Sequence, residues 1–287
     1  MKSGDARQLK GYTTMSFIRQ NSKLVDEFWE KGIVESCPIY DMHGHMGEHY
    51  AIYFAAPNAD EMVTLMRRAN VAKLCFSHHF SLWATPHVGQ APALEAAKKY
   101  PDILRFYCSI NPNYPDQIKK DLAKVGEWIP YCVGLKFLPD YHQKPVSDPA
   151  YKPALEFAEA LHLPILIHTW NGSPYDGPDV LRDVVPRYPH VTFMCAHCFN
   201  NNWTAAGELA KDYPNVYIEL TSVPGVRGAI EKMVSICGSE KILYGTDMPW
   251  FDEHQGVGGV LAADISDDDI HNILHRNAEK ILAPFIA

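Results

Sequence analysis

The sequence has 287 residues, of which 47% are hydrophobic and 21% are charged, a composition typical of a soluble globular protein and not of a disordered chain. Its 26 Lys and Arg against 34 Asp and Glu give a formal net charge of −8, which argues against a nucleic-acid partner, because binding to phosphates needs clustered basic side chains. No apolar run approaches the ~20 residues of a membrane helix, and residues 1–32 lack an apolar signal core, so neither a membrane partner nor secretion is predicted.

Cysteine usage indicates reduced thiols. Seven cysteines make an odd count with no regular spacing, and a chain of this length buries roughly 75% of its unfolded surface without disulfide staples. We therefore expect a cytosolic protein. Cys195 and Cys198 form a C-x-x-C pair that could bind zinc or act in redox chemistry. No second pair accompanies it, and the two residues flank a histidine at a predicted strand end, which favours a structural role.

Eight short β-branched or apolar runs recur along the chain with helical patterns between them, and each is predicted to be a strand. Their spacing of roughly 25 to 35 residues is that of one strand-loop-helix-loop unit. In chain order the predicted strands cover residues 39–42, 73–76, 106–110, 133–137, 165–167, 191–195, 216–220 and 242–244.

Three of the intervening helices carry start signals in addition to their apolar periodicity. Asn58 is followed three residues later by Glu61, the spacing of a capping box, ahead of apolar residues at helical spacing. Asp148 precedes a proline, which is favoured in the first turn of a helix. Ser266 with Asp269 predicts the N-terminus of the last helix.

Eight strands alternating with helices over about 250 residues predict an α/β fold, a single-domain (β/α)8 TIM barrel. A doubly wound open sheet is the alternative, but no G-x-G-x-x-G or P-loop glycine run follows any predicted strand. The barrel is expected over residues 37–287. Residues 1–36 are expected to form an N-terminal extension that packs on the barrel, with the amphipathic stretch 17–29 as a helix that plugs or covers its base.

Polar residues stand at the predicted carboxyl ends of four strands, where TIM barrels hold their catalytic groups. His43 and His45 end the first strand, and residues two apart on a strand project to the same side, so both imidazoles are expected to face the barrel mouth. His168 ends the fifth strand, His197 the sixth and Asp247 the eighth. Four histidines and one aspartate are therefore expected to converge on one rim.

These residue types predict a metal site. Imidazole and carboxylate groups suit Zn²⁺ and its first-row neighbours, and a catalytic site keeps one position open for water. The pKa of the bound water can fall to about 7. Asp247 is placed to take a proton from that water and return it to a leaving group. His197 is expected either to ligate the metal or to polarise the substrate carbonyl as it becomes an oxyanion.

The same residues belong to a longer series of motifs that resembles the amidohydrolase superfamily, and within it the branch called amidohydrolase-related or family 2. The matching segments cover nearly the whole chain after Ser36; they are Asp41-Met-His43-Gly-His45, Gly134-Leu-Lys136-Phe137, Ile167-His168-Thr169, the run from Tyr188 to His197, the run from Gly238 to Pro249, and Asn277-Ala278. The resemblance implies that His43, His45 and Asp247 bind one divalent metal, with His168 as a further ligand and His197 in substrate activation. Zinc is the metal it implies first, and manganese is the alternative.

Lys136, at the end of the fourth predicted strand, has two interpretations under this resemblance. In some members of the superfamily a lysine at this place is carboxylated and bridges two metals, whereas in this branch one metal is usual and the lysine is not a ligand. We expect an unmodified lysine that binds a substrate anion. The alternative is a buried amine paired with a carboxylate of the barrel.

Further rim positions are assigned to substrate binding from their place after predicted strands; they are His78, His79, Tyr141, Trp170, Arg227 and Trp250. Aromatic rings and a cation predict a small, flat or carboxylate-bearing ligand. The remaining histidines, His271 and His275 among them, lie on predicted loops or helices and receive no role.

The leading functional hypothesis is a metal-dependent hydrolase, in which a metal-activated water attacks the carbonyl carbon of a small lactone, ester or amide. The alternative is a lyase, because the branch also resembles metal-dependent decarboxylases of aromatic or unsaturated carboxylic acids. Those decarboxylases often have Glu-x-His on the first strand, so His43-x-His45 favours hydrolysis.

Lys136 and the charge of −8 disfavour a phosphodiesterase, and the full set of chemical residues disfavours a non-catalytic barrel. A small-molecule substrate is the expected partner, and a homo-oligomer stays open.

Overall fold

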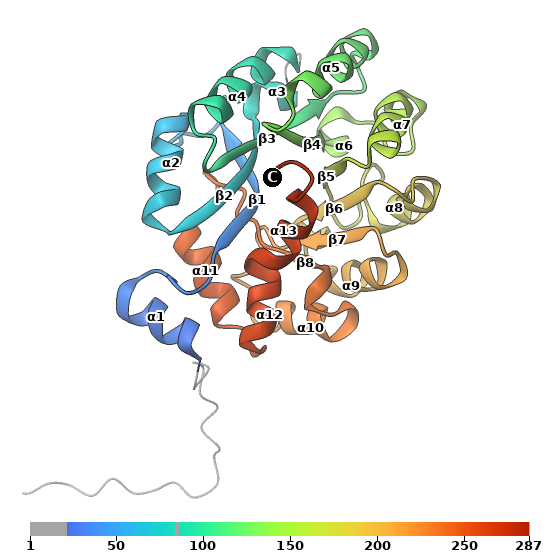
Figure 1. Cartoon of the computed structure of the whole chain (residues 1–287). Coiled ribbons are helices and arrows are strands. Elements are labelled where there is room, and N and C mark those ends of the chain that lie inside the picture. The colour runs from blue at the N-terminus through green and yellow to red at the C-terminus, as the bar shows by residue number, and fades with distance from the viewer. Residues whose placement is uncertain (1–21, 84–85, 287) are drawn as a thin grey trace, which may run out of the picture.

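The computed structural model describes residues 22–83 and 86–286, which form a ring of parallel strands with helices outside it (Figure 1). The strands pair in chain order from β1 to β8. Backbone hydrogen bonds join β1 to the segment after β8: Met42 N donates to Tyr244 O at 3.0 Å, and Asp247 N donates to His43 O at 2.6 Å. These bonds close the ring between its first and last strands and confirm the predicted (β/α)8 barrel over the doubly wound alternative.

All eight predicted strands are present, with bounds that differ from the prediction by a few residues. In chain order they are β1 (Ile39–Met46), β2 (Val71–His78), β3 (Leu104–Ile110), β4 (Cys132–Phe137), β5 (Pro164–His168), β6 (Thr192–Ala196), β7 (Val216–Glu219) and β8 (Ile242–Leu243).

Helices follow the strands and pack their apolar faces on the outside of the ring (Figure 1). They are α1 (Lys23–Lys31), α2 (Ala59–Arg68), α3 (His79–Trp83), α4 (His87–Lys99), α5 (Pro115–Trp128), α6 (Pro139–His142), α7 (Lys152–Leu161), α8 (Pro178–Val184), α9 (Trp203–Asp212), α10 (Ala229–Cys237), α11 (Glu253–Leu261), α12 (Asp267–His271) and α13 (Asn277–Leu282). A π-helical turn, η5 (Asn272–Arg276), joins the last two.

The predicted helix starts are confirmed by their hydrogen bonds. The side chain of Asn58 accepts from Glu61 N at the start of α2. Ser266 and Asp269 form a reciprocal capping box at the start of α12. Asp148 also caps, but the turn that follows it is a 3-10 turn, η1 (Pro149–Tyr151), and the α-helix begins only at Lys152. Each such cap contributes about 1 kcal/mol to helix stability.

The strands bring polar residues to one rim because they are all parallel. Their side chains point alternately into the barrel and toward the helices, and apolar residues fill both spaces. Several polar exceptions lie at the carboxyl ends of their strands. Lys136 is the second-last residue of β4, His168 is the last residue of β5, and Glu219 is the last residue of β7.

The described part of the N-terminal segment contains α1, which lies outside the ring beside α11 (Figure 1). Leu24 and Val25 are buried there, and the hydroxyl of Ser22 donates to Asp267 Oδ1 at 2.6 Å. Residues 17–21 of the predicted helix lie outside the described residues, and the division at residue 36 stays a prediction. None of the helices in the described ranges has the length and apolar character of a membrane span.

All seven cysteines lie within the described ranges, and each is a free thiol, as expected. The predicted C-x-x-C pair is buried. Cys198 donates its S–H to the backbone oxygen of Glu219 at 2.9 Å, so this thiol contributes to the packing between the end of β6 and β7.

Candidate active site

A cavity of about 200 Å³ opens at the carboxyl ends of the strands. This is smaller than the pockets that hold drug-sized molecules, so it suits a small ligand. Its floor is polar and carries the residues predicted to bind metal, and its walls are mainly aromatic and aliphatic. The lining residues are His43, His45, His79, Leu82, Trp83, Lys136, Leu138, Tyr141, His168, Trp170, His197, Ser222, Asp247, Trp250 and Phe251.

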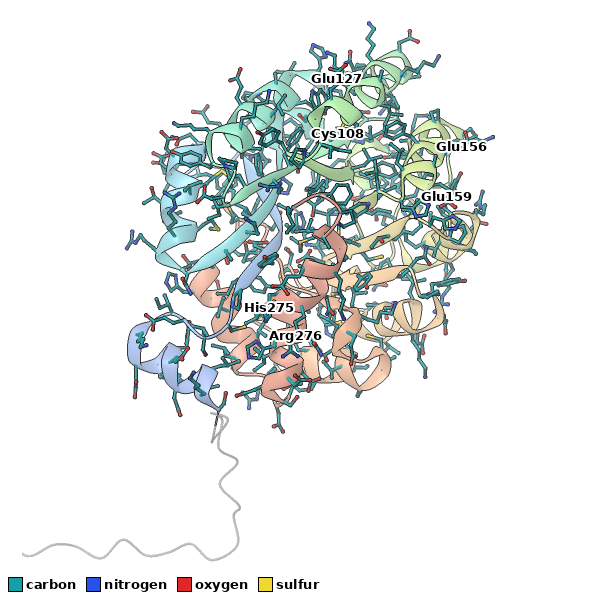
Figure 2. All side chains as sticks on the ribbon, viewed as in Figure 1. Cys108, Glu127, Glu156, Glu159, His275 and Arg276 are labelled. Carbon is teal, nitrogen blue, oxygen red and sulfur yellow. The ribbon has the colours of Figure 1, made fainter. Side chains whose placement is uncertain are left out.

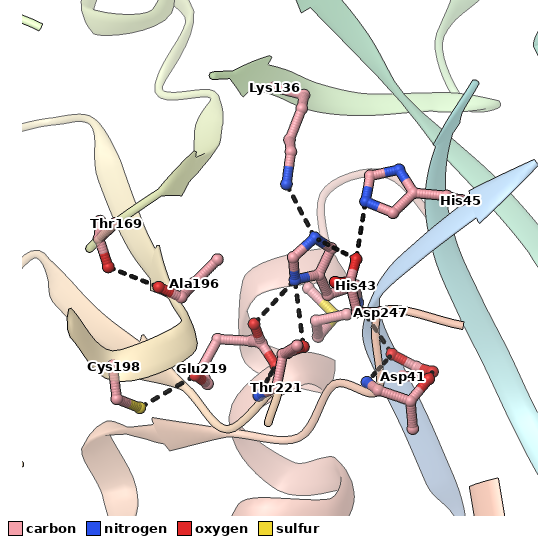
Figure 3. Close-up of polar contacts among 12 residues, drawn as sticks. Asp41, His43, His45, Lys136, Thr169, Ala196, Cys198, Glu219, Thr221 and Asp247 are labelled. Atoms are coloured by element: carbon pink, nitrogen blue, oxygen red, sulfur yellow. Dashed lines mark hydrogen bonds and ion pairs between the residues drawn. The ribbon is translucent and has the colours of Figure 1, made fainter. Parts of the chain in front are cut away.

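His43 is held by residues at the carboxyl end of β7, two strands away around the ring. Its Nδ1 lies 2.9 Å from Glu219 Oε2 and 3.2 Å from the hydroxyl of Thr221 (Figure 3). The carboxylate can accept only the proton of Nδ1–H, so the Nε2 lone pair of the neutral ring faces the cavity floor. Glu219 itself accepts from both the backbone N–H and the hydroxyl of Thr221, at 2.6 and 2.8 Å, which fixes its orientation.

His45 is held in a similar way. Its Nδ1 lies 3.1 Å from the hydroxyl of Ser77 on β2, which can accept the Nδ1 proton, and its ring stacks on that of His79 with centroids 5.0 Å apart. Its Nε2 therefore faces Asp247, as the alternation of β1 predicts.

Asp247 joins the two histidines of β1. Its Oδ1 lies 2.8 Å from His45 Nε2 and 3.3 Å from His43 Nε2 (Figure 3), yet it forms no hydrogen bond with the described residues. Its backbone has φ of 63°, the left-handed region that non-glycine residues seldom adopt and that collects at functional sites. Thr246 stabilises this turn by donating its hydroxyl to Asp41 Oδ2 at 2.6 Å.

His168 and His197 complete the polar floor. His168 Nδ1 lies 3.0 Å from Asp176 Oδ2, and its ring centroid is 4.9 Å from that of His197. The His197 ring is in turn 5.3 Å from that of His43. His197 has φ of 61°, and its buried Nδ1 has no hydrogen-bond partner among the described residues.

The donor set fits a divalent cation. One atom each from His43, His197 and Asp247 lies within 4.8 Å of the other two, close to the limit of about 4.4 Å set by two metal–ligand bonds of about 2.0–2.2 Å to a central ion. The unpaired buried atoms of His197 and Asp247 are the kind of donor that a cation would satisfy. The compact set is therefore His43, His197 and Asp247. His45 contacts Asp247, and the ring of His168 lies next to that of His197.

Burial keeps these imidazoles neutral. It lowers the pKa of His43 to about 3 and lowers the pKa values of His45 and His197 well below their usual 6.5. Neutral imidazole is the form that ligates metals. Burial raises the pKa of Glu219, and a cation on His43 opposes that shift, because positive charge favours the carboxylate.

Lys136 is buried and donates from Nζ to His43 Nε2 at 2.8 Å (Figure 3). Its one hydrogen bond among the described residues is to His43, and the carboxylates of Asp247 and Glu219 act on it through their charge, so both interpretations of Lys136 stay predictions. Burial lowers the pKa of Lys136 to about 8. The amine is therefore still largely protonated at neutral pH, and it lines the cavity.

Four of the six predicted rim residues line the cavity, namely His79, Tyr141, Trp170 and Trp250. The structure places His78 and Arg227 elsewhere. The chain turns from β2 into α3 between His78 and His79, so the two side chains point in different directions. His78 Nδ1 accepts from the backbone N–H of Phe80 at 3.1 Å. Arg227 lines a separate hollow beside α11.

Several residues of the site were not predicted. Glu219 lies inside a predicted strand and is buried in the structure. A carboxylate is unusual in a buried strand, and this is the signal in the sequence that could have identified it. Asp176 follows His168 by eight residues in a loop, and nothing in the sequence links the two. The apolar walls Leu82, Trp83 and Phe251 follow strands too, but their residue types are also those of ordinary core.

We expect Glu219→Gln to weaken metal binding by about 10- to 100-fold, because removing the carboxylate that orients a metal-ligating histidine has effects of this size. The amide can also donate to His43 Nδ1 and move the ring proton to Nε2, which blocks ligation. Competition with a chromophoric chelator measures the affinity. Glu208→Gln on the exposed face of α9 is the matched control, and equal affinity in the two variants would contradict the assignment.

Comparison with known proteins places these observations in a family. Residues 40–283 match the sequence model of the family described as Amidohydrolase. The chain is 27% identical over 177 residues to an uncharacterized metal-dependent hydrolase of Mycoplasma genitalium, a match that covers 55% of this chain and 64% of that protein. The chain spans less than two thirds of the length of the curated relatives it matches.

Solved structures share the fold. A 5-carboxyvanillate decarboxylase of Sphingomonas paucimobilis has a TM-score of 0.68 at 12% identity, with 86% of this chain and 99% of that chain covered. A probable 2-pyrone-4,6-dicarboxylic acid hydrolase of Acinetobacter baumannii has a TM-score of 0.62 at 14% identity, with 85% and 99% covered. A decarboxylase of the first kind from Novosphingobium aromaticivorans, complexed with manganese, has a TM-score of 0.67 at 13% identity, with 86% and 96% covered. At these identities the likeness concerns the fold alone.

Proposed function

Since the chain belongs to the amidohydrolase family, we propose that it is a metal-dependent hydrolase of a small lactone, ester or amide. The observation that carries this proposal is the position of Asp247, whose carboxylate touches Nε2 of both histidines of β1 and lines the cavity. A carboxylate there can contact a metal and a water molecule at once, which is the position of a general base.

The metal is proposed to be one divalent ion at the barrel mouth, zinc first and manganese as the alternative. Imidazole and carboxylate donors accommodate both ions. When bound, such an ion polarises a carbonyl group and lowers the pKa of a water molecule. His43, His45 and Asp247 would hold it, with His168 or His197 as a further donor.

The remaining steps belong to side chains of the cavity. Asp247 accepts a proton from water as the water oxygen bonds to the carbonyl carbon, and it returns that proton to the leaving oxygen or nitrogen as the old bond breaks. His197, whose ring is neutral and whose Nδ1 is unpaired, can donate a hydrogen bond to the developing oxyanion. The aromatic walls formed by Trp83, Trp170 and Trp250 exclude water around a flat substrate.

A decarboxylase is the second candidate, and the same cavity supports it. Its aromatic walls and its buried ammonium fit an aromatic carboxylate, and the chain shares its fold with 5-carboxyvanillate decarboxylase. In that reaction Asp247 would deliver a proton to the ring carbon from which CO2 departs. The His43-x-His45 pair favours hydrolysis.

The product identifies the reaction. A panel of small lactones, esters, amides and aromatic carboxylic acids should give acid release from a lactone, ester or amide, followed by pH-stat titration, and no CO2. Release of CO2 from an aromatic acid, with no acid from the other compounds, would replace the hydrolase by the lyase.

Lys136 is proposed to bind a substrate carboxylate once a cation has taken its partner, Nε2 of His43. We expect Lys136→Met to raise KM for carboxylate-bearing substrates by about 10- to 100-fold, because a hydrogen bond to a charged group contributes about 1.5–3 kcal/mol. KM for neutral analogues should change little. Steady-state kinetics on matched pairs of substrates tests this, with Lys211→Met on the surface as control; an equal rise for both members of a pair would contradict it.

A further inference from the structure

Two histidines without a role in the cavity lie beside a buried cysteine at the other end of the barrel. Cys37 precedes β1 by two residues, and His271 and His275 lie at the end of α12 and in η5. The turn η5 packs against β1 and β8, and Tyr244 N, directly after β8, donates to the backbone oxygen of Ile273 at 3.1 Å. Figure 2 labels His275 on the side of the barrel that carries α11 and α12.

This cluster is distinct from the cavity. Cys37 comes before the amino end of β1 and His43 lies near its carboxyl end, six residues on. At ~3.3 Å per strand residue, this stretch of chain separates them by up to about 20 Å. The donors of the cluster also differ in kind, because one of them is sulfur. The cavity is lined by nitrogen and oxygen donors only.

The three side chains converge. His271 Nδ1 lies 3.0 Å from His275 Nε2. One ring nitrogen of each histidine and Cys37 Sγ all lie within 4.8 Å of one another. The histidines are four residues apart on a helical segment, the spacing that puts two imidazoles on one face and binds zinc in other helices. A π-helical turn holds more residues per turn than an α-helix, so it brings side chains four apart closer to eclipsed.

Glu279 prepares His275 for ligation. Its Oε1 lies 3.0 Å from His275 Nδ1, one helical turn further on. The carboxylate accepts the Nδ1 proton and leaves the Nε2 lone pair directed at the cluster, as Glu219 does for His43. A carboxylate on the far nitrogen is the usual support of a metal-ligating histidine.

Charge around the cluster permits a cation. Arg276 is the nearby basic group, and it pairs with Asp268 Oδ1 at 2.5 Å. The positive charge of Arg276 lowers the pKa of the Cys37 thiol, whereas the negative charges of Glu27 and Glu279 raise it. Burial favours the neutral thiol of Cys37, but a coordinating thiol loses its proton to the solvent on metal binding, so the ion itself supplies the driving force.

We propose that Cys37, His271 and His275 form a second transition-metal site, which binds Zn²⁺ or another ion that accepts thiolate and imidazole, with water in the remaining position. One thiolate and two imidazoles select such ions over Mg²⁺, Ca²⁺ and Mn²⁺. The ion would tie the segment before β1 to the last helices of the chain. Binding to the folded chain alone would raise the temperature of unfolding.

Cobalt substitution of the full-length protein tests this site, because only a thiolate ligand gives a sulfur-to-cobalt charge-transfer band in the near ultraviolet. Metal-free protein titrated with Co²⁺ should bind two ions per chain and show the band. Cys37→Ser and, separately, His271→Ala should each lose the band and one ion while turnover is unchanged. The double variant His43→Ala/His45→Ala should keep the band.

Two control cysteines make the outcome specific. Cys237→Ser, in a half-buried position elsewhere, should leave the band unchanged. Cys198→Ser should also keep it; loss of the band in this variant would assign the thiolate to the barrel mouth and overturn the proposal. Binding of a single ion with no band, or a band that survives Cys37→Ser, would overturn it as well. His271 is half-buried, so its variant tests the site even if Cys37→Ser fails to fold.

Discussion

The double variant His43→Ala/His45→Ala is expected to lose the metal of the barrel mouth together with all turnover. Both Nε2 atoms lie within 3.3 Å of Asp247 Oδ1, so the variant removes His43, a donor of the compact set, together with the predicted ligand His45. Of the closely spaced donors only His197 and Asp247 then remain, fewer than the three protein ligands that such a site needs. Metal analysis of the purified variant, with turnover on the same sample, measures the effect.

Stability must be separated from ligation in this experiment. Removing the His43 ring leaves Glu219 buried without its partner, which destabilises a protein by several kcal/mol when the carboxylate stays charged. The single variant His45→Gln leaves the His43–Glu219 pair intact and should still lose most of the metal. His190→Ala, an exposed histidine paired with Glu159, is the matched control. Full metal and turnover in the folded double variant would remove the ligand assignment.

The part of the site that the sequence predicts well is the part fixed by strand geometry. Once eight strands are recognised, their carboxyl ends must meet at one rim, and the side-to-side alternation of β1 sends both histidines inward. His168, His197 and Asp247 follow from the same rule. Only the structure shows how closely His197 approaches His43 and Asp247. This approach depends on left-handed backbone conformations at His197 and Asp247, which cannot be predicted from the residue types.

The part that the sequence does not predict depends on the turn after each strand. His78 and His79 are adjacent, and which of the two faces the cavity is decided by the turn into α3. Arg227 lies in a longer connection, whose path has no periodicity to read. Asp176 reaches His168 only because the intervening loop folds back. The supporting carboxylates are therefore found from the structure, whereas the groups they support are found from the sequence.

Asp247→Asn is expected to lower kcat by about 10²- to 10⁴-fold, the usual contribution of a general acid–base group. The carboxamide has nearly the size of the carboxylate but accepts no proton at neutral pH. Asparagine also tolerates the left-handed backbone that position 247 adopts, so the turn that carries the side chain should persist. The fold should therefore be retained, as circular dichroism and thermal unfolding would show.

The metal content of the Asp247→Asn variant determines how its lower kcat is interpreted. If the variant keeps its metal, the fall in kcat measures proton transfer by Asp247; if the metal is lost too, saturating the assay with the ion restores occupancy before kcat is compared. Asp252→Asn, five residues later, is the matched control, because its exposed side chain caps α11 and asparagine caps a helix equally well. An Asp247→Asn enzyme that turns over like the Asp252→Asn enzyme at equal metal content would assign the proton shuttle to another group of the cavity, such as His197.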